Sequence, residues 1–320
     1  MSGDEVRDEV RLTNLDQPLF DGSQVTKRDL VEYLDAVRDR ILPELRGRPL
    51  SVIRVLRGQQ PFMQKNLPKY APPWMQRVTL WAESSRREVA YALCEDRRSL
   101  LWFANQRAVE YHPTLVRAER WDRPTHLVLD IDPPAGSPFP TAVAAARLVA
   151  QALAEVGMAG AVKTSGAKGL HVFVPIEDTP IEDAAAATRA LAERAERLDP
   201  ALATTEFIRE DRGGKVFLDS TRAGGATVVA AYSPRARPGA PVSFPVAWDD
   251  LDQVTPADFT VRNAATLLAR SDPWAELMPA PQQVAPVLIE EGHEIPVARV
   301  RAMHEGKRRA RARRAADEDA

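Results

Sequence analysis

The middle of the chain constrains the fold more than any other stretch, because strand-like and helix-like segments alternate there in a fixed order. Two long alanine-rich segments predict helices at 139–157 and 182–198. Short runs rich in apolar residues predict four strands, at 126–132, 161–164, 170–176 and 215–220. The predicted order from residue 126 to residue 220 is therefore β-α-β-β-α-β.

This order is the split unit shared by ferredoxin-like and RRM-like folds, in which two helices cover one face of an antiparallel sheet. We expect the other face to be free for a ligand. In the simplest version the last strand runs antiparallel to the first, which would separate side chains near the two carboxyl ends. The strand ends must be shifted, or the sheet elaborated, for such side chains to meet.

The first predicted strand ends in DIDPP, which places Asp130 and Asp132 two residues apart. Alternate residues of a strand project from the same face, about 7 Å apart. Two like charges there favour a divalent metal bound by oxygen ligands. The alternative is a polar turn, since aspartate before proline is common turn chemistry. Asp219, at the end of the last predicted strand, would complete a site for one or two metals.

The segment KTSGAKGLH joins two predicted strands by a tight turn at 165–169. Backbone N–H groups of such a turn, with Ser165 and the charge of Lys168, suit phosphate. The turn is not a Walker loop, which needs GxxxxGK[ST] leading into a helix. His171 follows two residues later, and either a structural or a phosphate-binding role fits it. Three arginines beyond Asp219 suit phosphate or a plain surface loop: Arg222, Arg235 and Arg237.

The part before residue 126 predicts a smaller mixed unit. A helix is expected at 26–45 with Thr26 as its N-cap, a hairpin at 78–84 and 88–96, and a helix at 99–116 that breaks at His112 and Pro113. Residues 60–74 predict an irregular segment that mixes Phe62, Lys65 and other aromatic and basic residues. Either nucleic-acid binding or buried aromatics with solvated lysines explains that mixture.

The ends and the region after Asp219 predict less regular structure. We expect a disordered acidic leader at 1–10, an apolar strand at 226–232, a helix at 259–270 and an extended segment at 273–288. Six basic residues at 307–314 predict a solvated tail with nonspecific attraction for phosphate. The expected division is a leader at 1–10, a smaller unit at 11–122, a central unit at 123–280 and a C-terminal segment with the basic tail at 281–320.

Composition excludes several classes of protein. With 44% hydrophobic and 28% charged residues, the chain has the make-up of a soluble globular protein. One cysteine, Cys94, excludes an intrachain disulfide and a multi-cysteine zinc site. No signal peptide or membrane-length apolar run is visible. We expect a cytoplasmic protein without membrane attachment.

The motifs DID, SGAKGLHVFVP, KVFLDSTR and ATVVAAYSPRAR, in this order, closely resemble the polymerase domain of the bacterial DNA ligase D family, a branch of the archaeo-eukaryotic primase superfamily. The likeness runs from about residue 10 to residue 273. It implies an α/β (α+β) primase-type catalytic core at 123–280 with an N-terminal, DNA-contacting subdomain at 11–122. Because no ligase or nuclease module is present, the chain resembles the stand-alone primase-polymerases of actinobacteria.

The resemblance implies template-directed addition of nucleotides to a 3′-hydroxyl with two manganese or magnesium ions, a preference for ribonucleotides, and a role in end joining or short-gap repair at the nucleoid. A gapped or broken DNA duplex, NTP or dNTP, a repair ligase and end-binding proteins are the implied partners of a monomer. Metal-binding carboxylates are matched by Asp130, Asp132 and Asp219. The triphosphate site is matched by His112, Ser165, Lys168, His171, Arg222, Arg235 and Arg237.

DNA contacts are implied for Lys27, Phe62, Met63 and Lys65. Met63 stands in place of the second of two aromatics that stack on template and nucleotide. Gln17 stands in place of a second lysine that holds a 5′-phosphate, and Ala223 in place of an asparagine. Two other interpretations stay open, namely a noncatalytic module that binds DNA gaps or ends, and a primase that starts chains de novo.

Overall fold

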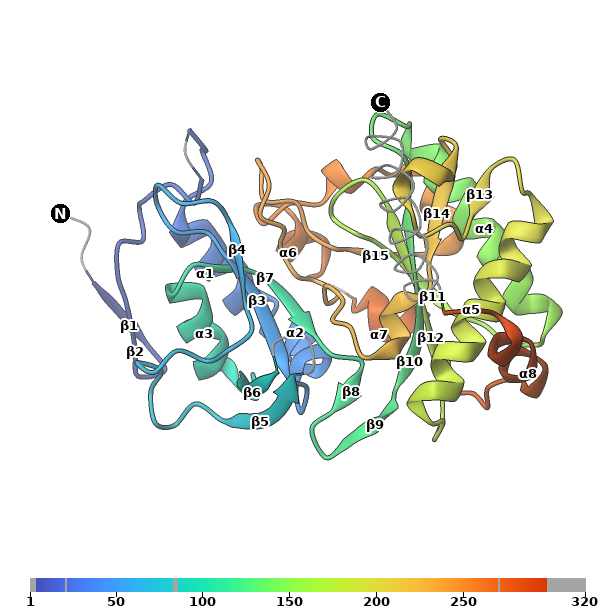
Figure 1. Cartoon of the computed structure of the whole chain (residues 1–320). Helices are drawn as coiled ribbons and strands as arrows, with labels where there is room; N and C mark the ends of the chain where they lie inside the picture. Colours follow the sequence, from blue (N-terminus) through green and yellow to red (C-terminus); the bar gives the residue numbers. More distant parts are fainter. Residues whose placement is uncertain (1–3, 21, 83–85, 270, 298–320) are drawn as a thin grey trace, which may run out of the picture.

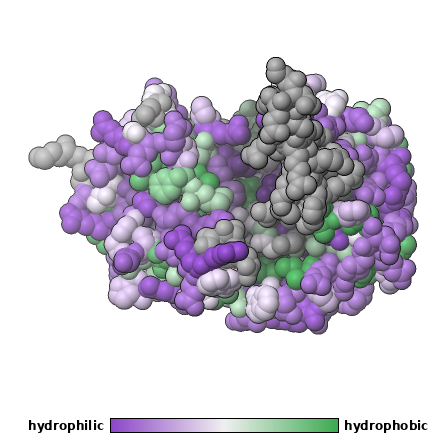
Figure 2. All heavy atoms as spheres, viewed as in Figure 1, coloured by the Kyte–Doolittle hydropathy of each residue, from purple (hydrophilic) through white to green (hydrophobic). Residues whose placement is uncertain are grey.

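The computed structural model describes residues 4–20, 22–82, 86–269 and 271–297 of the 320-residue chain. Two parts built on separate sheets lie side by side (Figure 1). Most of the surface seen in Figure 2 is hydrophilic, with apolar residues gathered in small patches. Among the described residues, no helix combines the length and the apolar character needed to cross a membrane.

The C-terminal part is built on a six-stranded sheet whose order is β13-β14-β10-β12-β11-β15. The four predicted strands form its centre, in the order last, first, third, second, and all their pairings are antiparallel. The β-α-β-β-α-β prediction is therefore confirmed, with one short strand added at each edge. The bounds are β10 His126–Asp132, β11 Ala161–Thr164, β12 Leu170–Pro175, β13 Ala203–Thr204, β14 Val216–Asp219 and β15 Pro245–Val246.

The helices α4 (Phe139–Glu155) and α5 (Ile181–Leu198) lie on one side of this sheet, and the N-terminal part lies on the other (Figure 1). Their buried faces consist largely of alanine, which favours helix and lets a helix approach its neighbours closely. A further helix, α8 (Pro286–Glu294), packs on α5. A Cβ added to Gly292 would lie 1.9 Å from the carbonyl oxygen of Ala186, so only glycine permits this contact.

The pairing of β14 with β10 resolves the problem of strand ends. β14 pairs with only the last three residues of β10, and Asp219 lies directly opposite Asp130. The two strands are antiparallel, but they are shifted along each other so that their carboxyl-terminal residues lie side by side. The shifted-strand alternative is thus the one observed.

The N-terminal part combines a five-stranded sheet with three helices. Its central strand β3 pairs with β7 on one side and with β4 and β6 on the other. Thr26 is the N-cap of α1, as predicted, and forms a capping box with Asp29. The elements are α1 Lys27–Ala36, α2 Arg38–Leu45, α3 Arg97–Asn105, β3 Leu50–Arg54, β4 Phe62–Gln64, β5 Arg77–Ala82, β6 Arg87–Ala92 and β7 Ala108–Pro113. Hairpins are formed by β1 Glu5–Arg7 with β2 Val10–Leu12, and by β8 Val116–Arg117 with β9 Arg120–Pro124.

Three predictions for this part are wrong in detail. The β1–β2 hairpin begins at Glu5, so the leader predicted at 1–10 is ordered from there, and residues 1–3 lie outside the described residues. The segment predicted as irregular contains β4, which pairs with β3. The helix predicted at 99–116 ends at Asn105, because Arg107 adopts a left-handed φ of 59° and the next six residues pair with β3 as β7.

The region after Asp219 also differs from the prediction. Residues 226–232 form no regular strand, although Val228 and Ala230 donate backbone hydrogen bonds to Pro113 and Tyr111 of β7. The helix predicted at 259–270 is reduced to α6 (Ala264–Leu267), and the segment predicted as extended contains α7 (Pro273–Leu277) and the start of α8. Short 3-10 helices are η1 Arg209–Arg212, η2 Thr221–Gly224, η3 Trp248–Gln253 and η4 Pro256–Asp258. The basic stretch 307–314 lies outside the described residues.

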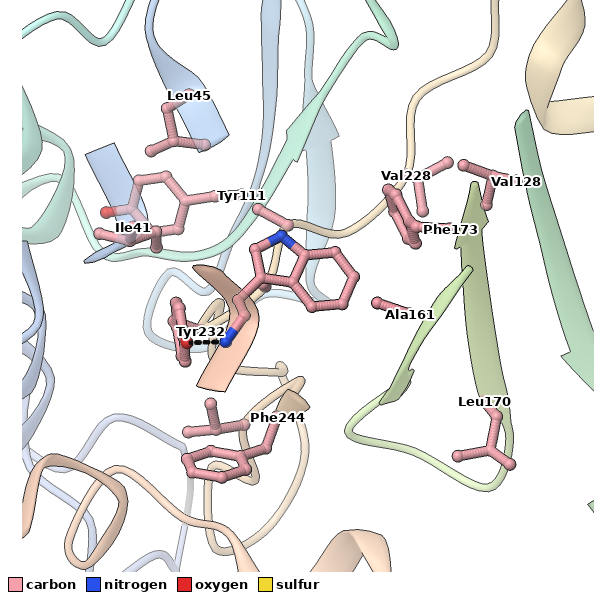
Figure 3. Packing of buried hydrophobic residues seen from close by; sticks show 14 of the residues in the cluster. Ile41, Leu45, Tyr111, Val128, Ala161, Leu170, Phe173, Val228, Tyr232 and Phe244 are labelled. Atoms are coloured by element: carbon pink, nitrogen blue, oxygen red, sulfur yellow. Dashed lines mark hydrogen bonds between the residues drawn. The ribbon is translucent and has the colours of Figure 1, made fainter. Parts of the chain in front are cut away.

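A continuous hydrophobic core joins the two parts (Figure 3). Phe173 of β12 lies edge-on to Trp274, with ring centroids 5.3 Å apart. The hydroxyl of Tyr232 accepts a hydrogen bond of 3.0 Å from the Trp274 backbone, and Tyr33 donates one of 2.8 Å to the Tyr232 carbonyl. This packing covers part of the sheet face opposite α4 and α5, and the polar end of β10 lies beyond it.

Candidate functional site

Four polar residues form a row across the central sheet, one on each of four adjacent strands. Asp219 is paired with Asp130, Asp130 with His171, and His171 with Lys163. Residues directly opposite each other on neighbouring strands project from the same face, with Cβ atoms about 5 Å apart. The register of the sheet therefore gathers two carboxylates, an imidazole and an ammonium group on one face.

Arg222, on η2, supplies positive charge between the two carboxylates. Its Nη2 atom lies 3.1 Å from Asp130 Oδ2 and 3.2 Å from Asp219 Oδ2. Burial alone would raise the pKa of Asp130, but His171 and Arg222 outweigh burial and hold that pKa well below its usual range. Asp219 also accepts hydrogen bonds from the backbone and hydroxyl of Thr221, which fixes its orientation.

Asp132 projects from the same face but meets different cations. Its Oδ1 atom lies 2.9 Å from Lys168 Nζ, and its Oδ2 atom lies 3.6 Å from Arg212 Nη1. Lys168 also donates to the carbonyl of Pro133, which ties the turn to the end of β10. Across the described ranges, no three acidic, histidine or cysteine side chains converge as a ready ligand set for a metal ion. Each of the three predicted carboxylates instead contacts a basic side chain.

The turn at 165–169 is ordered by its own serine. The Ser165 hydroxyl accepts 3.2 Å hydrogen bonds from the backbone N–H groups of Ala167 and Gly169, and the Ser165 amide donates to the Gly169 carbonyl at 2.9 Å. A Cβ at Gly169 would lie 2.0 Å from the carbonyl oxygen of Ile131. Glycine is therefore what lets the turn lie against β10, and it brings Lys168 to Asp132.

His171 and Lys163 are both almost completely buried. His171 Nε2 lies 3.4 Å from Asp130 Oδ1, and its Nδ1 lies 2.8 Å from Lys163 Nζ. Burial, followed by the charge of Lys163, lowers the pKa of His171 to about 4, so the ring is neutral near pH 7. Lys163 also donates a 2.6 Å hydrogen bond to the Ser243 hydroxyl.

The N-terminal part contributes Glu110 and His112 from β7. His112 Nε2 and Glu110 Oε2 are 2.8 Å apart, and Arg235 Nε lies 3.1 Å from the same carboxylate oxygen without hydrogen-bond alignment. Burial would raise the pKa of Glu110, but His112 and Arg235 hold it at about 2. Arg235 also donates to the Ser165 carbonyl at 2.5 Å, and Arg237 is exposed in the same loop. Glu110 thus holds His112 and Arg235 beside the turn.

The residues predicted to contact DNA are not all alike in exposure. Phe62, Met63 and Lys65 follow one another on or beside β4, and Met63 and Lys65 are exposed. Lys27, in contrast, is only 3% exposed, and its ammonium group donates to the Thr13 carbonyl and the Asn105 side chain at 2.6 and 2.7 Å. Gln17 lines a surface cavity of about 410 Å³ together with Arg57 and Phe20.

Sequence reasoning missed four side chains that the fold brings to this site: Lys163, Ser243, Glu110 and Arg212. Lysine is depleted in strands and rarely buried, so Lys163 in the apolar run before the turn was a detectable signal. Nothing comparable marks the other three, because their positions depend on contacts between distant segments.

Comparison with known proteins places these features in a family. A family model described as the LigD primase-polymerase domain matches residues 26–274. The chain is 34% identical over 262 residues to the bifunctional non-homologous end joining protein LigD of Bacillus subtilis, covering 80% of this chain and 42% of that protein. It is also 34% identical over 289 residues to the multifunctional non-homologous end joining protein LigD of Mycobacterium bovis, covering 86% and 38%. The chain thus spans about two fifths of the length of these relatives.

A solved structure is similar over most of the chain. It is the polymerase domain from Mycobacterium tuberculosis ligase D in complex with DNA. The two structures align with a TM-score of 0.75 and 32% sequence identity, over 85% of this chain and 100% of that one.

Proposed function

The chain belongs to the LigD primase-polymerase domain family, and from this premise we propose that it is a nucleotidyltransferase that extends a primer 3′-hydroxyl along a template at gaps or breaks in duplex DNA. One observation carries the proposal: Asp130 lies directly opposite Asp219, with Asp132 two residues away on the same face. The relatives' names support a role in non-homologous end joining, and the DNA complex of the similar structure supports a DNA partner.

The donor set fits two divalent cations, manganese or magnesium. Carboxylate oxygens are the ligands that such hard cations prefer, and Asp130, Asp132 and Asp219 supply up to six of them. Arg222 and Lys168 now neutralise these carboxylates, so both cationic side chains would move toward the phosphates of a bound nucleotide. When bound, the ions would lower the pKa of the attacking hydroxyl and neutralise charge on the triphosphate and the leaving group.

The surrounding cations suit the triphosphate of NTP or dNTP. Lys168 and Arg222 contact the carboxylates, and Arg235 contacts the neighbouring turn at Ser165. A guanidinium group matches phosphate oxygens in a forked pair of hydrogen bonds, whereas the Lys168 ammonium acts as a point charge. His171, neutral near pH 7, can donate from Nε2, and Glu110 orients His112 and Arg235.

In the proposed reaction the primer 3′-oxygen attacks the α-phosphorus of the nucleotide. A new P–O bond forms, the bond between the α-phosphorus and its bridging oxygen to the β-phosphate breaks, and pyrophosphate leaves. The proton of the hydroxyl passes to solvent or to a carboxylate of the row. The protein contributes positioning and charge, which is most of what phosphoryl transfer requires.

We also propose that the N-terminal part contacts the DNA through Phe62, Met63 and Lys65, and that the protein acts at the nucleoid beside a repair ligase and end-binding proteins. Exposed Met63 and Lys65 on and beside β4 support DNA contact, since bases stack on apolar and aromatic faces while lysine meets phosphate. Lys27 is buried, and the surface cavity beside Arg57 is lined by Gln17 in place of a lysine. Both observations support weak recognition of a 5′-phosphate. We also propose a preference for ribonucleotides, for which the resemblance to the family is the sole support.

Primer extension on a short gapped duplex tests the function. Wild-type protein with Mn²⁺ should add nucleotides, and Asp130→Ala with Asp132→Ala should abolish addition while fluorescence anisotropy still detects DNA binding. Asp252→Ala, in a surface ion pair with Arg147, is the matched control and should retain activity. Manganese-dependent extension by the double variant would reject the assignment of these carboxylates.

The same assay separates the alternatives. A noncatalytic module would bind gapped DNA without extending the primer under any metal. A primase would make products from an unprimed template. Competition between ribo- and deoxyribonucleotides, on gaps with and without a 5′-phosphate, measures the two remaining preferences.

A further inference from the structure

We propose that Lys163 is a positioning residue, which fixes the tautomer and orientation of His171 for the nucleotide through a buried chain of hydrogen bonds. The proposal rests on the proposed function in one respect, namely that His171 meets the bound nucleotide. Its structural part concerns contacts within the protein and can be tested without nucleotide.

The contact between the two side chains follows from the sheet. Lys163 on β11 and His171 on β12 are directly opposite each other, and they are 0% and 4% exposed. Lys163 Nζ lies 2.8 Å from His171 Nδ1. The ammonium group also lies 5.4 Å from the centre of the Phe173 ring, two residues along on the same face of β12. Water is thereby kept from this nitrogen of the imidazole.

The direction of each hydrogen bond follows from the donors available. The Ser243 hydroxyl donates its single hydrogen to the Thr164 carbonyl at 2.8 Å, so it accepts from Lys163 at 2.6 Å. Burial lowers the pKa of Lys163 well below its usual value, but in either charge state its amino group keeps a hydrogen for a second bond after it donates to Ser243. His171 Nε2 lies 3.4 Å from Asp130 Oδ1, a carboxylate oxygen that only accepts, so the hydrogen of the neutral ring lies on Nε2 and Nδ1 accepts from Lys163 at 2.8 Å. The chain from the Thr164 carbonyl to Asp130 has one consistent arrangement of hydrogens.

The position of Lys163 is costly for a residue with only a packing role. Burial lowers the pKa of Lys163 well below its usual value, and none of the carboxylates among the described residues forms an ion pair with its amino group. Methionine has a similar length and would pack against Phe173 without that cost. What lysine adds is a donor aimed at Nδ1, which leaves Nε2 as the nitrogen that carries hydrogen on the side of the carboxylates.

The first test is made on the nucleotide-free protein. In protein labelled with ¹⁵N-histidine, His171 Nδ1 should resonate as a hydrogen-bonded acceptor and Nε2 as the protonated nitrogen. Lys163→Met should move the Nδ1 resonance toward that of an acceptor without a hydrogen bond. Val162→Ala, a change of the adjacent residue on the opposite face of β11, should leave it unchanged. An Nδ1 resonance that is the same in wild type and Lys163→Met overturns the proposal.

The second test is a double-mutant cycle on nucleotide affinity, measured with a chain-terminated primer so that turnover plays no part. Lys163→Met should weaken nucleotide binding about tenfold with intact His171, the effect of one hydrogen bond, and should have no effect in a His171→Ala background. Equal weakening in both backgrounds overturns the proposal. Ser243→Ala, which leaves Lys163 in place without its acceptor, should act in the same direction if Lys163→Met does not fold.

The two tests distinguish failure of the proposed function from failure of the role proposed for Lys163. If wild-type protein binds no nucleotide, the proposed function fails, and the ¹⁵N comparison still decides whether Lys163 orients His171. If nucleotide binds but the cycle shows no coupling, the role of Lys163 is rejected and the proposed function stands.

Discussion

Arg222 neutralises the carboxylates that we assign to metal, so replacing it should have opposite effects on the metal-free and metal-bound protein. At an effective dielectric constant of about 20, a charge pair at 3.1–3.2 Å is worth about 5 kcal/mol before desolvation. The side chains of Arg222, Asp130 and Asp219 are 34%, 21% and 10% exposed, between surface and buried pairs. We therefore expect Arg222→Met to lower the free energy of unfolding by about 2 kcal/mol without metal.

The metal-bound state should respond in the other direction. In the wild type, a divalent ion must displace the guanidinium group from both carboxylates, and in Arg222→Met this cost is absent. A cost of about 2 kcal/mol corresponds to about 30-fold in affinity, so the variant should bind Mn²⁺ about 10- to 30-fold more tightly. Isothermal titration calorimetry without nucleotide measures this directly.

Thermal unfolding in EDTA and in Mn²⁺ gives an independent measurement. The midpoint for Arg222→Met should fall by about 3 °C in EDTA, and most of that loss should disappear in Mn²⁺. Arg147→Met, which removes an arginine–aspartate pair with Asp252 on the surface, is the control and should change neither value appreciably. Equal or weaker Mn²⁺ binding by Arg222→Met would refute the assignment of Asp130 and Asp219 as ligands.

Two further predictions concern the turn and acid stability. Gly169→Ala should destabilise the protein by about 3 kcal/mol and impair primer extension, because the added Cβ would lie 2.0 Å from the Ile131 carbonyl oxygen. Chemical denaturation measures the loss of stability. Unchanged stability would contradict the close approach of the turn to β10. Burial, with the charges of Arg48 and Arg117, lowers the pKa of His126 to about 3, so the unfolded chain binds a proton that the folded chain does not between about pH 6.5 and pH 3. Stability should therefore fall as the pH falls through this window, and less steeply in His126→Asn; parallel curves from denaturation at pH 4, 5, 6 and 7 would show that another group is responsible.

The central sheet could be predicted because its signals are local. Alanine-rich segments and short apolar runs alternate over 126–220 without interruption, and the proline after DID marks where β10 ends. The same local signals misassign β7. Its residues continue an apolar pattern that begins in α3, and only pairing with β3, more than 50 residues earlier, makes them a strand.

The residues of the site also fall into those that could be predicted from the sequence and those that could not. The aspartates and the turn could be found because residue type and spacing carry the chemistry. Lys163 could not be assigned to His171, because their contact depends on which residues of β11 and β12 lie opposite each other. The positions of Glu110 and Ser243 in the site could not be predicted either, because each lies on a segment that approaches the site only in the folded chain.

The polar row of Asp219, Asp130, His171 and Lys163 should also favour one register of these strands during folding. A slip of one residue in any of these strands would turn its polar group toward the face covered by the alanine-rich helices, where burying an unpaired charge is costly. Misaligned sheets are thereby penalised by the very groups that we assign to the reaction. Length changes of one residue in the loops between these strands should consequently be tolerated only where the loop absorbs them, and the five-residue turn at 165–169 is too short to do so.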